Sequence, residues 1–175
     1  MIKAFYKIFI ITTAASIVGG IFGFAFYFFF EETAVLLIEK FKFIQSIFGI
    51  ETYREGMSFP YIFLVIFLGN LISTIGYFGL GYIRAVMPVA FITGFLITVL
   101  LFTGTVRHSR GIPADVIILV SVEAFYRVLA LSTGEYANKN KFKNEKGILA
   151  AVSFIIILFL FGVFFEVYSI FGSIF

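Results

Sequence analysis

The stretch GILAAVSFIIILFLFGVFF, residues 147–165, decides the class of this protein. No charged residue interrupts it, and Lys146 and Glu166 flank it. An α-helix needs roughly 20 apolar residues to cross the hydrocarbon core of a bilayer. Because a helix satisfies its own backbone hydrogen bonds in lipid, this stretch predicts a transmembrane helix.

The rest of the chain has the same character. Of its 175 residues, 61% are hydrophobic and 13% are charged, and the mean hydropathy is +1.09. A soluble domain is nearer half apolar and a quarter charged. We therefore predict an all-α, polytopic transmembrane bundle that forms a single membrane domain over residues 1–175. Its expected location is the cell membrane, as a multi-pass protein.

Windowed hydropathy predicts five spans. They cover about residues 5–30, 59–83, 86–105, 112–136 and 147–170. The N-terminus begins with Lys3 and Lys7 and continues into a long apolar run, which resembles a signal peptide at its start. Its apolar run is too long for a signal peptide, and no cleavage site of small residues follows it. We expect it to be retained as a transmembrane helix.

The linker between the first two spans, about residues 31–58, has a different composition. Its apolar residues are interrupted by Glu39, Lys40 and Lys42, so it is too charged to span. This pattern favours an amphipathic helix at the membrane interface or packed on the bundle, with an ordered loop as the alternative.

Loop charges predict a cytoplasmic N-terminus, because basic residues are enriched in cytoplasmic loops. This orientation puts seven basic residues inside and five outside. The inside set is Lys3, Lys7, Arg84, Lys139, Lys141, Lys143 and Lys146. The outside set is Lys40, Lys42, Arg54, Arg107 and Arg110. The net charge of +3 is scattered over span ends, so no nucleic-acid partner is expected.

Small residues mark two predicted packing surfaces. Gly19 and Gly23 are one helical turn apart in the first span, which lets two backbones approach closely. They predict packing against another span of the chain, with oligomerisation as the alternative. In the second span, Gly69, Ser73 and Gly76 fall on one helical face and predict another packing surface.

Four strongly polar residues lie in apolar spans: Asn70, Glu123, Arg127 and Glu166. Such residues are costly in lipid and usually face the bundle interior. Glu123 and Arg127 are four residues apart, which predicts an ion pair on one helical face, with Asn70 or Glu166 as further partners. Three interpretations stay open for this intramembrane polar cluster: a structural ion pair, a proton, ion or substrate site, and a polar patch that binds a partner.

Sequence signals of catalysis and cofactor binding are missing. His108 is the single histidine and there is no cysteine, so a metal site is not expected. The sequence also lacks a P-loop and a GxGxxG motif. We therefore expect no catalytic residues, no cofactor and no enzymatic activity.

Several segments resemble the SpoIIM family, named after stage II sporulation protein M. IFLGNLISTIGYFGLG resembles the family's apolar segment with an Asn followed by spaced glycines, and PVAFITGF resembles its next helix, with the small pair Thr93 and Gly94. SVEAFYRVLALSTGEY resembles the central helix, in which a Glu precedes a Gly, here Glu123 and Gly134. LFLFGVFFEVY resembles the final helix, which ends with a Glu.

The resemblance covers most of the chain from about Phe59 onward, together with the general plan of an N-terminal span, and it has departures. The family's central helix usually has His-Gly before the Glu, where this chain has Leu119 and Val120, and commonly Leu after it, where this chain has Ala124. The family's namesake is a membrane scaffold that holds peptidoglycan-degrading enzymes at the engulfing septum.

The resemblance and the missing catalytic set together predict a non-enzymatic scaffold or complex subunit of the cell membrane. The expected partners are the lipid bilayer, membrane or envelope proteins, and a second copy of the chain. The alternative is a small oligomeric transporter or channel-like protein that uses the intramembrane polar cluster.

Overall fold

The computed structural model describes residues 2–47, 58–103, 112–143 and 145–171. These ranges contain six helices and no strand. The helices are α1 (Ile2–Phe29), α2 (Glu31–Ile47), α3 (Phe59–Tyr82), α4 (Val86–Thr103), α6 (Ala114–Asn140) and α7 (Glu145–Phe171). All except α2 are long and apolar enough to cross a membrane. The predicted all-α class with five membrane-spanning helices is therefore confirmed.

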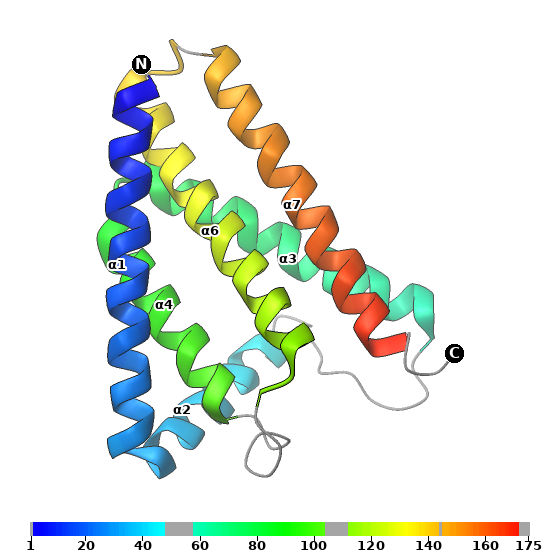
Figure 1. Cartoon of the computed structure of the whole chain (residues 1–175). Helices are drawn as coiled ribbons and strands as arrows, with labels where there is room; N and C mark the ends of the chain where they lie inside the picture. The colour runs from blue at the N-terminus through cyan, green and yellow to red at the C-terminus, as the bar shows by residue number, and fades with distance from the viewer. Residues whose placement is uncertain (1, 48–57, 104–111, 144, 172–175) are drawn as a thin grey trace.

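The five long helices alternate in direction (Figure 1). Helices α1, α4 and α7 run one way, and α3 and α6 run the other way. The start of α1 and the end of α7 therefore lie at opposite ends of the bundle (Figure 1). The predicted outside residues Arg54, Arg107 and Arg110, and also His108, lie outside the described residues.

Helices α1 and α4 pack closely through glycines on both sides of their contact. A Cβ added at Gly19 would overlap the Phe91 carbonyl, and one at Gly94 would overlap the Ser16 carbonyl. Gly23 faces the backbone of α4 in the same way. Small residues let helix backbones approach closely, which strengthens the van der Waals packing between helices in lipid. The contact that Gly19 and Gly23 make is thus within the chain.

A second glycine contact joins α3 to α6. A Cβ at Gly81 would overlap the Leu131 carbonyl, and one at Gly134 would overlap the Phe78 carbonyl. Around Gly134, the α6 residues from Val128 to Thr133 are all buried. Helix α6 also packs against α1, α4 and α7. It is therefore the central helix of the bundle.

Of the three residues predicted to form a packing surface, Gly69, Ser73 and Gly76, the last meets no other described helix of the chain. This glycine is exposed, and no atom lies within 4 Å of a Cβ built on it. Gly69 and Ser73 are partly buried. The close contact of α3 is instead made by Gly81. Gly81 lies five positions after Gly76. Because a helix has 3.6 residues per turn, the two glycines face different sides of α3.

Helix α6 ends later than predicted. Hydropathy places the end of this span at about Tyr136, whereas the helix continues to Asn140. The added turn is polar, and it is stabilised by the ion pair between Lys139 and Glu135 and by the Asn140 side-chain amide, which donates to the Tyr136 carbonyl at 2.9 Å. Lys141 then adopts a left-handed conformation, which ends the helix.

Helix α2 occupies the first part of the predicted amphipathic linker. It packs against α4, and its residues Ala34 and Ile38 are buried with Val99. Leu36, between them in sequence, is exposed. The linker is thus helical over residues 31–47, while residues 48–57 lie outside the described residues.

Candidate functional site

The predicted ion pair of α6 is present. The Arg127 guanidinium lies 3.1 Å from the Glu123 carboxylate, and each side chain is 18% exposed. The two residues face each other because four helical residues bring side chains to the same face. Their charges compensate each other within an apolar helix, which lowers the cost of holding either one there.

Asn70 of α3 connects this pair to a second helix. Its side-chain oxygen accepts a hydrogen bond from the Tyr126 hydroxyl at 2.9 Å and another from Arg127 at 3.2 Å. Glu166 of α7 lies close enough to Asn70, Glu123 and Arg127 for its carboxylate to interact with all three. Polar side chains of three membrane-spanning helices therefore meet here.

Tyr126 is a member of the cluster that the sequence analysis missed. Its side chain is 1% exposed, and its ring meets Phe159 of α7 edge to face, with the centroids 6.3 Å apart. Gly162 of α7 lies beside it, and a Cβ added there would make an ordinary van der Waals contact with the Tyr126 ring at 3.6 Å. A signal was available, because a Tyr inside a span needs a partner for its hydroxyl when it is buried.

We define the polar cluster as Asn70, Glu123, Tyr126, Arg127 and Glu166. It contains two carboxylates and one guanidinium, so its formal charge is −1 when all three groups are ionised. The Arg127 Nε atom is buried, and among the described residues it has no hydrogen-bond partner. The cluster thus has one spare donor and one more negative than positive group.

A separate polar contact joins α3 to α4. The Tyr77 and Thr93 hydroxyl oxygens lie 2.7 Å apart, and Thr93 also donates to the Val89 carbonyl of its own helix. The buried hydroxyls of Thr12, Ser132 and Thr133 donate to carbonyls one turn earlier. These hydroxyls therefore satisfy their hydrogen bonds without help from another span.

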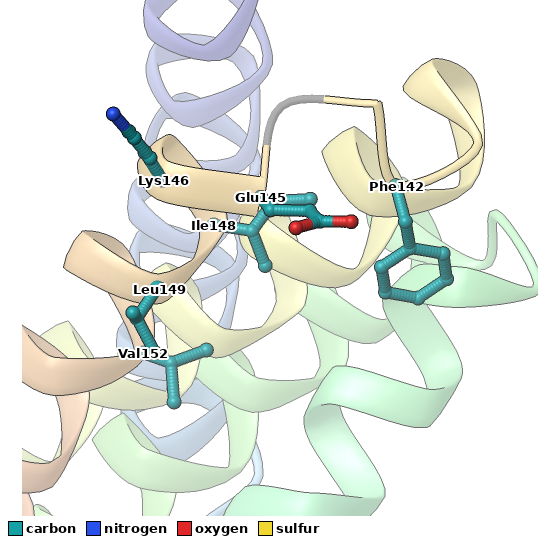
Figure 2. Close-up of a pocket in the computed structure, with 6 residues that line it drawn as sticks. All are labelled: Phe142, Glu145, Lys146, Ile148, Leu149 and Val152. Atoms are coloured by element: carbon teal, nitrogen blue, oxygen red, sulfur yellow. The ribbon is translucent and has the colours of Figure 1, made fainter.

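A groove lies at the start of α7, and we call it the α7 groove. Its volume is about 430 Å³. It is lined by Phe142, Glu145, Lys146, Ile148, Leu149 and Val152 (Figure 2). None of these residues belongs to the polar cluster. In the described part of the chain, no group of three or more His, Cys, Asp or Glu residues could hold a metal ion.

In comparisons with known proteins, no family model, no curated protein and no solved structure matches the chain.

Proposed function

We propose that this chain is a non-enzymatic scaffold or complex subunit of the cell membrane. In this proposal the polar cluster locks three helices in one arrangement, and the outer surface of the bundle presents that arrangement to partner proteins. The partners would be membrane or envelope proteins, or a second copy of the chain.

The observation that carries the proposal is that the polar side chains of three spans close on one another. Asn70 accepts hydrogen bonds from the Tyr126 hydroxyl and the Arg127 guanidinium, Glu123 pairs with Arg127, and the Glu166 carboxylate lies beside these groups. A transport path would need these groups to face a water-filled passage. The α7 groove shares no residue with the cluster. Most polar groups of the cluster thus have a partner inside it, which supports a structural role.

The resemblance to the SpoIIM family supports the same proposal. The residues that carry it include Asn70, Glu123 and Glu166, all of which lie in the polar cluster, and Gly94 and Gly134, which lie in the glycine contacts. Since the family's namesake is a scaffold, the resemblance supports proposing a related role for this chain.

One observation favours a second candidate, transport of a proton or cation. The cluster contains two carboxylates, Glu123 and Glu166, for one guanidinium, Arg127. A surplus carboxylate within a span is a common feature of proton relays and ion paths. In this alternative the cluster would exchange its ion with water at one end of the bundle.

A paired experiment separates the two candidates. The full chain is reconstituted in liposomes, and proton and sodium fluxes are measured for wild type, Glu123→Gln and protein-free vesicles. In parallel, the tagged chain is crosslinked in native membranes, purified and analysed by quantitative mass spectrometry.

The scaffold proposal expects equal fluxes in all three preparations and one partner that is recovered in a fixed ratio to the chain. A flux present in wild type and abolished by Glu123→Gln would overturn it in favour of transport. Recovery of the chain with no partner in a fixed ratio, after crosslinking, would also contradict it.

A further inference from the structure

The α7 groove combines an apolar wall with an unusual backbone. Leu149 is 67% exposed and Phe142 is 45% exposed, although both are large apolar residues. Lys141 and Phe142 have φ values of 48° and 57°, a left-handed conformation that is unfavourable for side chains with a Cβ. This turn holds the Phe142 ring across the groove from α7 (Figure 2).

Positive charge is concentrated beside this groove. Residues 135–146 contain four lysines and two glutamates. Lys139 pairs with Glu135. Lys141, Lys143 and Lys146 are exposed, and they form no ion pair with any residue that the structure describes. The segment therefore offers three lysine ammonium groups to a ligand.

The groove also lies where a span meets the headgroup region. Helix α7 begins at Glu145, and its apolar run starts two residues later. At the same end of the bundle, the Arg84 guanidinium donates to Asn138 at 3.0 Å, and Phe5 near the start of α1 packs against Tyr136. Basic residues from three chain segments thus gather at this end: the start of α1, the turn at Arg84, and the segment from the end of α6 to the start of α7.

We propose that the α7 groove binds one anionic phospholipid. An acyl chain lies along Ile148, Leu149 and Val152, and the phosphate sits at the rim beside Lys143 and Lys146. The Glu145 carboxylate points toward Phe142, and the Lys146 ammonium points away from that side (Figure 2). The Glu145 carboxylate repels a phosphate from the inside of the groove. The phosphate of the lipid therefore lies at the rim, on the side of Lys146.

The charges select an anionic lipid over the other candidate occupants. A zwitterionic lipid has the same acyl chains but no net charge to meet the lysines. Free phosphate has the charge but nothing to cover the apolar wall. Lysines near a membrane surface attract anionic lipids by an amount that corresponds to about fivefold in affinity for each residue.

Native mass spectrometry of the purified full chain tests this proposal. The chain in detergent is titrated with dioleoyl phosphatidylglycerol and with dioleoyl phosphatidylcholine, and its thermal stability is measured with each lipid and with inorganic phosphate. The test variant is Lys143→Gln with Lys146→Gln. The matched control is Lys40→Gln with Lys42→Gln, which removes two exposed charges from α2.

We expect wild type to bind one phosphatidylglycerol at least tenfold more tightly than phosphatidylcholine. The test variant should lose roughly 10- to 30-fold in affinity for phosphatidylglycerol, and the control should lose none. Leu149→Asn, at an exposed position, should weaken phosphatidylglycerol binding about fivefold, because it removes apolar surface of the groove that the acyl chain would cover.

Three results would overturn the proposal. They are equal binding of the two lipids by wild type, equal losses in the two double variants, and stabilisation by phosphate alone that matches phosphatidylglycerol. The comparison of lipids on wild type decides the matter even if the test variant fails to fold.

Discussion

Single residues of the polar cluster differ in how many partners depend on them. Glu123 and Arg127 depend on each other, and Arg127 also donates to Asn70. An intact pair leaves its helix nearly neutral, whereas the loss of one member strands a charge in a medium of low dielectric constant. For buried pairs this costs about 3–5 kcal/mol, and the partial exposure of this pair places it at or below the lower end.

A double-mutant cycle tests this dependence. We expect Glu123→Gln and Arg127→Met each to lower the free energy of unfolding, by up to about 3 kcal/mol. The double variant should recover part of the loss, because no unpaired charge remains. Thermal unfolding of the four purified proteins measures the coupling. Unchanged stability in both single variants would show that the pair is not structural.

Asn70 should matter more than Tyr126, because it serves more partners. Asn70→Leu removes the acceptor of both Tyr126 and Arg127 and should cost about 1–3 kcal/mol. Tyr126→Phe removes one hydroxyl and leaves Asn70 bonded to Arg127, so it should cost about 1 kcal/mol or less. Chemical denaturation of both variants gives the comparison. A larger loss in Tyr126→Phe would contradict the central place of Asn70.

At the scale of elements, the bundle consists of two glycine-packed helix pairs and a final helix. Helix α1 packs on α4 and α3 packs on α6, each through glycines from both partners. Helix α7 then packs on α6 and α3. The two pairs are joined because α6 also contacts α1 and α4. Small residues thus set the separation of the helices, and the polar cluster adds directional contacts.

Glycine substitutions test the contact between α3 and α6. In Gly134→Ala, the new methyl group would overlap the Phe78 carbonyl, and overpacking of this kind costs about 1–3 kcal/mol. Gly76→Ala is the matched control, since no atom lies within 4 Å of its added Cβ. The control should be neutral or more stable, because Ala is the better helix former. Thermal unfolding compares the two, and equal losses would contradict the close contact.

At the scale of the whole molecule, charge differs between the two ends of the bundle. Seven basic residues lie at the end where α1 starts and α6 ends, together with Glu135 and Glu145. The described part of the other end has two lysines, Lys40 and Lys42, and four acidic residues. The excess of basic residues favours the first end as the cytoplasmic one.

Cysteine labelling in intact cells tests this orientation, and the chain has no cysteine of its own. Asn140→Cys, at the end of α6, should be shielded from a membrane-impermeant thiol reagent. Ser58→Cys, at the start of α3 and exposed, should react with it. Both substitutions leave the charge unchanged. The reverse labelling pattern would invert the topology.

The sequence by itself determined the class of the protein, its five spans and the Glu123–Arg127 pair. These depend on composition and on spacing within one helix, which are local to the chain. The sequence also placed Asn70 and Glu166 in apolar spans as candidate partners of the pair, although their contacts remained open.

Only the tertiary structure decided which faces of the helices meet. It brought Asn70 and Tyr126 together, used Gly81 for the close contact of α3 with α6, and formed the α7 groove from the turn after α6 and the start of α7. In a soluble helix, an apolar stripe predicts the buried face. In lipid, the surroundings are as apolar as the protein interior, so hydropathy does not distinguish the two faces. The contacts between spans therefore follow from shape and hydrogen bonding in three dimensions.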